Sequence, residues 1–320
     1  MLTNTFCHIP TIGTRTEGRI WASGVRNWSA FRDSAAPQSG EALRGRPAAV
    51  PMSPKRAGVV RANLDESARR LEAGDSGWFY DRLPANEHWR LFTSFRDDVA
   101  YLDIETTGLG TPRDHVTTIA LYDGHSVFTY VHGRNSASPS TLRSGEDTSL
   151  RSTSCAAASQ SRGMGDFVRD IRRFKLLVTF NGKQFDVPFL RDYLGVSVDR
   201  PHIDLRFVLA SVGLSGSLKK CEHAIGLSRG DLEGVDGYFA VILWQEYVRR
   251  GNATALETLL AYNVEDVVNL ETLMVHAYNL KLRETPFAET HTLSVPSRPE
   301  VTFQADAATV SRIRRAYHLP

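Results

Sequence analysis

The stretch AYLDIETTGLG, residues 100–110, is the segment that says most about the fold. Its apolar residues predict a buried β-strand, yet the strand carries Asp103 and Glu105. Strand side chains alternate between faces, which places these two acids roughly 6.5–7 Å apart on one face, where they can converge on one cation. The other interpretation is an acid pair that faces water at a sheet edge. The two predicted faces are Val99, Tyr101, Asp103 and Glu105, against Ala100, Leu102 and Ile104.

A third carboxylate stands on an apolar stripe in the last quarter of the chain. A helix is expected from about residue 254 to 283, and LLAYNVEDVVNLETLM within it repeats apolar residues at spacings of three and four. Asp266 interrupts this stripe, with Tyr262 one turn earlier on the same face. An unpaired carboxylate there would cost several kcal/mol. Asp266 therefore needs a metal, or else an arginine or backbone donors that hold it in the core.

The third segment is LVTFNGKQFDVPFL, residues 177–190. A buried strand ends at a turn that contains Asn181 and Lys183, and Asp186 stands just before a helix in which Pro188 suits the first turn. Asp186 is thus a candidate ligand, or only the N-cap of that helix. Asn181 is equally consistent with a turn residue, and Lys183 with an exposed one.

Together these segments supply four carboxylates that can meet at one end of a sheet. Acids in such a cluster repel one another strongly unless divalent cations occupy the site. Oxygen ligands alone suit Mg²⁺ or Mn²⁺, whereas zinc prefers histidine and cysteine. The sequence therefore predicts a magnesium or manganese centre built from Asp103, Glu105, Asp186 and Asp266.

The order of elements between about 97 and 285 indicates an α/β fold. Two alternating segments meet at Asp123-Gly124, which is a strong hairpin signal. Helices and strands then alternate, which predicts a mixed sheet flanked by helices. The Ser/Thr-rich stretch 134–162 has no periodicity and is interpreted as a disordered insertion.

Three motifs in this order resemble those of the DEDD exonucleases in the ribonuclease H-like superfamily: LDIETTGL, FNGKQFDVPFL and YNVEDVVNL. Tyr262, four residues before Asp266, matches the tyrosine-bearing branch. The segments, with HIDL between the second and third, are most similar to YprB-type ribonuclease H-like proteins of bacteria. The resemblance implies a mixed five-stranded sheet and a 3′–5′ exonuclease acting by a two-metal mechanism on nucleic acid, DNA or RNA, at a single-stranded end.

The resemblance also implies roles for single residues. Asp103 would bridge two Mg²⁺ or Mn²⁺ ions, with Glu105 and Asp266 on the first and Asp186 on the second. Tyr262 would orient the attacking water. Four further residues are expected to contact substrate: Thr106, Thr107, Asn181 and Lys183. Asp204, in HIDLR, stands at a family-like position and is also consistent with a local cap or ion pair.

Outside 97–285 the sequence predicts a small helical segment over 1–31, a flexible linker over 32–61, a helical and aromatic lead-in over 62–96, and a loose tail over 286–320. Residues 1–96 hold 14 basic and 9 acidic residues, a net charge of +5, whereas the whole chain carries +2. This balance favours a polyanion partner or a plain solvated surface. The Ile12-Gly13 turn resembles part of a helix-hairpin-helix, and a helical packing arm is the alternative.

Composition narrows the class of protein. No apolar run is long enough to cross a membrane, and the first residues lack the pattern of a secretion signal. The three cysteines are far apart and show no metal-ligand spacing, which predicts reduced thiols in a cytoplasmic protein. A metal-dependent exonuclease is thus the preferred hypothesis. Its rivals are a nucleic-acid-binding or scaffold protein with a vestigial site, and a ribonuclease H-like endonuclease or recombinase.

Overall fold

The computed structural model describes residues 1–34, 52–111, 113–134, 161–195 and 197–318. Its strands are β1 (Val99–Thr106), β2 (Val116–Tyr122), β3 (Val127–Val131), β4 (Arg162–Gly163), β5 (Leu176–Thr179) and β6 (His202–Asp204). Its longer helices are α1 (Thr14–Ala22), α2 (Trp28–Ser34), α3 (Pro54–Glu72), α7 (Met164–Asp170), α8 (Asp186–Leu194), α9 (Leu205–Ser211), α10 (Leu218–Ala224), α11 (Gly237–Arg250), α12 (Ala253–Leu282) and α14 (Ala307–Tyr317). Short helical turns are η1 (Leu2–Asn4), α4 (Ser76–Tyr80), η2 (Ala85–Leu91), α5 (Phe92–Phe95), η3 (Arg96–Asp98), η4 (Ile171–Arg173), η5 (Gly230–Leu232) and α13 (Ala288–His291).

The strands form one mixed sheet in the order β4-β3-β2-β1-β5-β6. Strands β1, β2 and β3 are antiparallel, whereas β4, β5 and β6 each run parallel to their inner neighbour. The predicted α/β class, with its mixed sheet flanked by helices, is confirmed. The described residues form six strands where five were expected, because Arg162 and Gly163 add a two-residue strand beside β3. The predicted hairpin is also present, and Gly124 has the positive φ of 90° that its turn requires.

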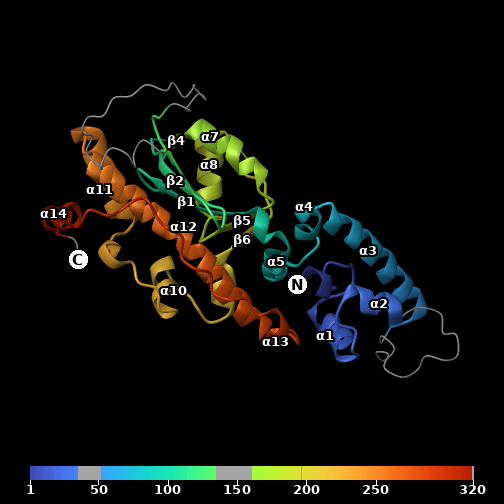
Figure 1. Cartoon of the computed structure of the whole chain (residues 1–320). Coiled ribbons are helices and arrows are strands. Elements are labelled where there is room, and N and C mark those ends of the chain that lie inside the picture. The colour runs from blue at the N-terminus through green and yellow to red at the C-terminus, as the bar shows by residue number, and fades with distance from the viewer. Residues whose placement is uncertain (35–51, 112, 135–160, 196, 319–320) are drawn as a thin grey trace, which may run out of the picture.

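The alternation of β1 divides the core into two layers. Val99 and Tyr101 pack in the larger cluster together with α12, whereas Ala100, Leu102 and Ile104 pack in a second cluster with α7 and α8. Figure 1 shows α12 crossing one face of the sheet while α7 and α8 cover the other. The acids Asp103 and Glu105 therefore point toward α12, as the predicted faces require.

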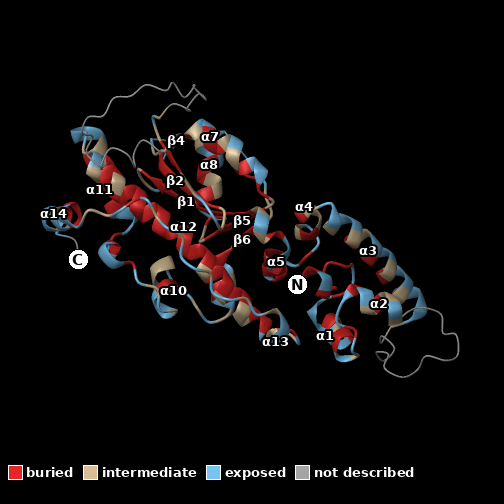
Figure 2. Ribbon diagram, in the orientation of Figure 1, coloured by how far each residue is buried: buried red, intermediate tan, exposed pale blue. Residues whose placement is uncertain are grey.

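Helix α12 is the central element of the molecule. It begins where Asn252 caps it by accepting a hydrogen bond from the Ala255 N–H, close to the predicted start at 254. Most of its residues are buried, and Figure 2 shows it red over much of its length. Glu271 ties it to the sheet, accepting hydrogen bonds from Arg96 at 2.6 Å and from the Tyr122 hydroxyl at 3.2 Å. A helix held on several sides can place a side chain at a fixed point above β1.

The N-terminal helices pack against the lead-in as part of the larger core cluster. Arg90 is buried and forms ion pairs at 2.7 Å with both Glu17 of α1 and Glu87 of η2. Trp21 packs edge-on against Phe287, just beyond α12, with ring centroids 5.3 Å apart. Ile12, beside the turn that resembled a helix-hairpin-helix, is buried too. These contacts favour the interpretation of a packing arm.

Two predicted segments have different limits in the structure. Helix α3 begins at Pro54, inside the predicted linker 32–61, because Ser53 caps it and proline suits the first helical turn. Residues 32–34 of that linker belong to α2. The predicted insertion 134–162 lies mostly outside the described residues, but its last residue, Arg162, belongs to β4.

The C-terminal tail is not loose, which corrects the prediction for 286–320. Asp306 caps α14 by accepting from the Thr309 N–H at 2.6 Å. Val310 and Ile313, three residues apart, bury one face of this helix in the core cluster that contains α12. Arg298, before α14, reaches back to form an ion pair with Glu265 of α12. The tail lacks large apolar runs because one helical face is enough to attach it.

Within the described ranges, no helix combines the length and apolar character needed to cross a membrane. Cys7 and Cys221 are buried free thiols, as predicted, while Cys155 lies outside the described residues.

Replacing Ile313 by alanine should lower the free energy of unfolding by about 2–4 kcal/mol, because it leaves a cavity under α14. Urea denaturation followed by circular dichroism measures this change. The matched control is Arg315→Ala on the exposed side of the same helix, which should change stability by less than about 0.5 kcal/mol. Equal stability of Ile313→Ala and wild type would show that the tail does not pack as described.

Candidate metal centre

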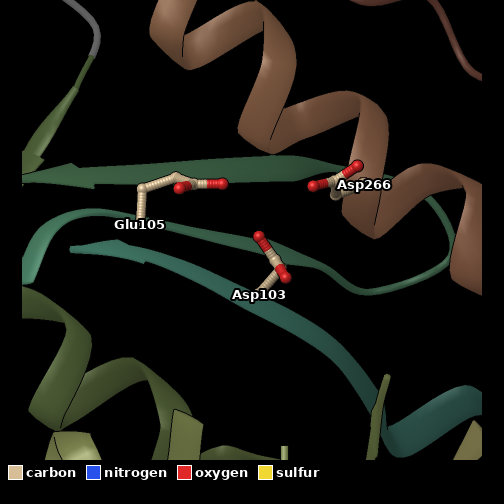
Figure 3. A group of neighbouring side chains, drawn as sticks. All are labelled: Asp103, Glu105 and Asp266. Carbon is tan, nitrogen blue, oxygen red and sulfur yellow. The ribbon is translucent and has the colours of Figure 1, made fainter. Parts of the chain in front are cut away.

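Three carboxylates from β1 and α12 converge above the centre of the sheet. Each of Asp103, Glu105 and Asp266 offers a carboxylate oxygen, and these oxygens lie within 4.8 Å of one another. In Figure 3 the side chains of Asp103 and Glu105, from β1, extend toward that of Asp266, from α12. A shift in the β1–β2 register between Glu105 and Thr106 marks the point where the strand leaves regular pairing. The site thus lies where a central strand ends beneath a buried helix.

Burial and mutual repulsion dominate the electrostatics of this cluster. Burial raises the pKa of Asp103 and of Glu105 well above the ordinary value, and the charge of Asp266 raises both further. Burial also raises the pKa of Asp266, to about 6, although Arg229 lowers it. In the absence of a cation, burial and mutual repulsion thus favour the protonated forms of Asp103 and Glu105.

Asp186 lies beside the cluster rather than within the group of three. Its Oδ1 accepts a hydrogen bond from the Ile104 N–H at 3.2 Å, and Ile104 is the residue between the two acids of β1. Asp186 is the first residue of α8, but no side-chain cap bond starts that helix. Burial raises the pKa of Asp186 to about 7 against the lowering effect of backbone hydrogen bonds. Asp186 is therefore a buried acid at the site and not a simple N-cap.

Asn263 is a site residue that sequence reasoning missed. Its side-chain amide donates to Asp103 Oδ2 at 2.7 Å, and its carbonyl oxygen accepts from the Thr118 hydroxyl at 3.0 Å. Asn263 thereby fixes one oxygen of Asp103 from α12. A signal existed, because Asn263 stands three residues before Asp266 and so lies on the same side of the helix.

A buried arginine was also missed, and the sequence held no signal for it. Arg229, in the loop after α10, places Nη1 2.5 Å from Asp266 Oδ1 and binds Glu222 with two further nitrogens. Asp266 thus has the arginine partner that one interpretation of this core acid expected. Tyr262 is buried next to this arginine, whose guanidinium carbon lies 5.7 Å from the tyrosine ring centre. Burial raises the pKa of Tyr262 well above its ordinary value, so the phenol keeps its proton.

The turn after β5, which contains Asn181 and Lys183, is held by Asp204. The carboxylate of Asp204 accepts from the backbone N–H groups of Asn181 at 2.8 Å and Lys183 at 3.1 Å. It also caps α9 through the Arg206 N–H, which confirms the interpretation of Asp204 as a local cap. Asn181 has a positive φ of 65°, and its side-chain oxygen accepts from Arg206. The side chain of Lys183 lies over the Tyr80 ring, 5.6 Å from its centre.

Thr106 and Thr107 follow the acids and form the turn after β1. The Thr106 hydroxyl donates to the Gly108 carbonyl at 2.6 Å, and the Thr107 hydroxyl accepts from the His115 N–H at 3.0 Å. Both hydroxyls therefore shape the loop. Their predicted contact with substrate stays a prediction.

The donor set fits a hard divalent cation. Asp103, Glu105 and Asp266 present only oxygen, and they lie close enough for one ion to contact all three. Asp266 Oδ1 also lacks a well-aligned hydrogen-bond donor, although Arg229 is beside it. No cysteine or histidine belongs to this group, which argues against zinc. The structure thus supports divalent-metal binding by this triad.

Comparison with known proteins agrees with this geometry. The family model described as the RNase_H superfamily matches residues 100–278, more than half of the chain. The curated proteins include no match. A solved structure of the family B DNA polymerase from the hyperthermophilic archaeon Pyrobaculum calidifontis is similar at 18% identity and a TM-score of 0.37. The match covers 58% of this chain but only 24% of the polymerase chain.

The matched region begins within β1, ends within α12 and includes every acid of the candidate metal centre. It also coincides with the mixed sheet in which β1, β2 and β3 are antiparallel. This chain therefore belongs to the RNase H superfamily.

Proposed function

We propose that this protein is a nuclease that depends on divalent metal and hydrolyses phosphodiester bonds of nucleic acid. The observation that carries the proposal is the convergence of Asp103, Glu105 and Asp266 within 4.8 Å of one another. Membership of the RNase H superfamily supports it, since members of this superfamily are typically phosphodiester hydrolases. The Y-x-x-x-D spacing of Tyr262 and Asp266 favours a 3′–5′ exonuclease of the DEDD tyrosine branch, similar to YprB-type proteins.

Each side chain has a role that follows from its surroundings. Asp103, Glu105 and Asp266 would hold the first of two Mg²⁺ or Mn²⁺ ions, and Asp186 together with Asp103 would hold the second. Bound metal supplies charge stabilisation and a water of lowered pKa at the phosphodiester. Tyr262 remains a neutral phenol, which suits it to orient that water by hydrogen bonding.

The substrate would be a nucleic-acid end, DNA or RNA, bound across the strand ends around the acids. Two threonines, Thr106 and Thr107, directly follow Glu105 in the sequence, and Asn181 and Lys183 shortly precede Asp186. This proximity to the acids in the sequence makes all four residues candidate substrate contacts. Lys183 carries the positive charge that attracts phosphate. The basic N-terminal region, residues 1–96, would add affinity that does not depend on sequence and falls as salt rises.

One observation favours the rival function, a nucleic-acid-binding protein with a weak or vestigial site. Asp266 already has a cationic partner, because Arg229 lies 2.5 Å from it. In that case the arginine would replace the metal, and the acids would have a structural role only. Activity that depends on both metal and acids separates the two functions.

With Mn²⁺ or Mg²⁺, the purified protein should shorten 5′-labelled single-stranded DNA or RNA stepwise from the 3′ end. Asp103→Ala and Asp266→Asn should each reduce the rate by at least a hundredfold, because they remove a metal ligand. Substrates blocked separately at the 3′ and 5′ ends test the polarity. The control is Asp199→Asn, the same kind of change at an exposed acid away from the triad, which should leave the rate unchanged.

Identical product ladders from wild type and both site variants would identify a contaminating nuclease. Absence of any metal-dependent product on either nucleic acid would favour the vestigial site.

The pH dependence of the free energy of unfolding should reveal the burial of Asp186 without any measurement of activity. Its folded pKa of about 7 exceeds an unfolded value of about 4, so the folded state binds the proton more tightly between these values. This group's contribution to the free energy of unfolding therefore falls as pH rises through that window. Without metal, Asp186→Asn should gain about 2 kcal/mol relative to wild type between pH 5.5 and 7.5. Urea denaturation of both proteins at the two pH values measures this gain.

The wild type must be compared with a variant, because other groups in the protein make the free energy of unfolding rise with pH. Burial lowers the pKa of His8 and of His202 to about 3, which makes stability rise with pH, and their effect cancels in the difference. Adding Mn²⁺ should raise the melting temperature of wild type more at pH 7.5 than at pH 5.5, because metal and protons compete for the same oxygens. A metal effect that is equal at both pH values would contradict binding at these acids.

A further inference from the structure

Arg229 presents an electrostatic problem at the candidate metal centre. The side chain is buried, with 7% of its surface exposed, and Nη1 lies 2.5 Å from Asp266 Oδ1. Neither atom makes a well-aligned hydrogen bond, so the contact is mainly an attraction between charges. Burial alone would lower the pKa of Arg229, but the carboxylates of Asp266 and Glu222 raise it above its ordinary value. The guanidinium is therefore charged. A positive charge in contact with a metal ligand would repel a divalent cation at short range.

Glu222 removes this problem by neutralising the arginine. Its Oε2 accepts from Arg229 Nε at 2.6 Å, and its Oε1 accepts from Arg229 Nη2 at 2.7 Å. Glu222 is 1% exposed, so solvent does not weaken this paired contact. Asn269 donates to the same Oε1 at 3.0 Å from α12, which holds the glutamate in place. Arg229 and Glu222 together therefore carry no net charge beside the site.

The closest contact between Asp266 and Arg229 uses a single oxygen of the carboxylate, Oδ1. A carboxylate has a second oxygen, which is able to bind metal while the first contacts the arginine. In Figure 3 one oxygen of Asp266 points toward Asp103 and Glu105 while the other points away. Partners of this kind, which bind a metal ligand rather than the metal, orient the ligand and tune its affinity.

We propose that Arg229 and Glu222 form a charge-balanced positioning pair, in which Arg229 holds Asp266 and Glu222 cancels the charge that would otherwise repel the metal. This inference rests on the proposed metal-dependent function and deepens it. It makes the affinity for metal depend on the net charge of two residues that bind no metal themselves. It also removes the reason to regard Arg229 as a substitute for the cation.

A charge cycle on the full-length protein tests the pair. The probe is Mn²⁺ alone, and its dissociation constant is measured without nucleic acid from the electron paramagnetic resonance signal of free Mn²⁺. Glu222→Gln leaves Arg229 positive and should weaken Mn²⁺ binding about tenfold or more. Arg229→Gln leaves Glu222 negative and should tighten binding by a similar factor. The double variant restores neutrality and should bind within about threefold of wild type.

Tighter binding by Arg229→Gln is the outcome that a purely structural role would not produce, since loss of structure weakens binding in either single variant. Weaker or unchanged binding in that variant would overturn the proposal, as would wild-type affinity in Glu222→Gln. If a single variant does not fold, as judged by near-ultraviolet circular dichroism, the double variant decides. The double variant leaves neither charge of the pair unbalanced, and a loss of Mn²⁺ affinity of more than threefold in that variant would overturn the proposal.

Two controls separate this test from the proposed function itself. Glu246→Gln changes another buried glutamate, on α11, which binds Arg250 of the same helix and Arg312 of α14. This variant should leave Mn²⁺ affinity unchanged. Asp103→Ala should weaken Mn²⁺ binding severely, which locates the measured site. If wild type bound no Mn²⁺, the metal-dependent function would fail. If wild type bound Mn²⁺ and the charge cycle showed no effect, only the pairing of Arg229 and Glu222 would fail.

Discussion

Repulsion among buried carboxylates is the constraint on which the rest of this structure depends. Asp103, Glu105 and Asp266 share a small volume, in which Glu105 and Asp266 are buried and Asp103 is half-buried, and like charges interact strongly in such surroundings. A protein retains such a cluster only if positive charge, bound protons or hydrogen-bond donors offset the repulsion. Asn263 and Arg229 offset part of it, and a divalent cation would offset the remainder.

The architecture holds the acids together against that repulsion. Strand β1 pairs with β2 along Asp103 and Glu105, and with β5 just before them, at residues 99–101, which holds the backbone under the two acids in place. Helix α12 is fixed above it by the core and by Glu271, which binds both Arg96 and Tyr122. Helix α14 and the segment around Phe287 pack against the same core cluster. The segments outside the matched family region thus support the helix that carries Asp266.

The surroundings of Asp266 show how a structural and a catalytic interpretation of one residue can both hold. An arginine does contact this core aspartate, as a purely structural role requires. The same carboxylate also faces two further acids that nothing in a purely structural role explains. Because Glu222 neutralises the arginine, the ion pair and a metal ion are compatible at one aspartate.

The sequence by itself determined the features that follow from local periodicity. The period of two in β1 placed Asp103 and Glu105 on the face opposite Leu102, and helical spacing placed Asp266 on a buried side of α12. Residues 286–320 were misjudged because a single amphipathic helix leaves only a weak pattern, and the start of α3 at Pro54 was missed within a segment of linker-like composition.

Only the tertiary structure decided which residues complete the site. Arg229 and Glu222 come from α10 and the loop that follows it, and no local pattern relates them to Asp266. Asp204 reaches the turn at Asn181 across neighbouring strand ends, and Asn263 reaches Asp103 from the helix to the sheet. These contacts depend on how separate elements pack. Periodicity within one element specifies which way a side chain faces, but not which side chains of other elements it will meet.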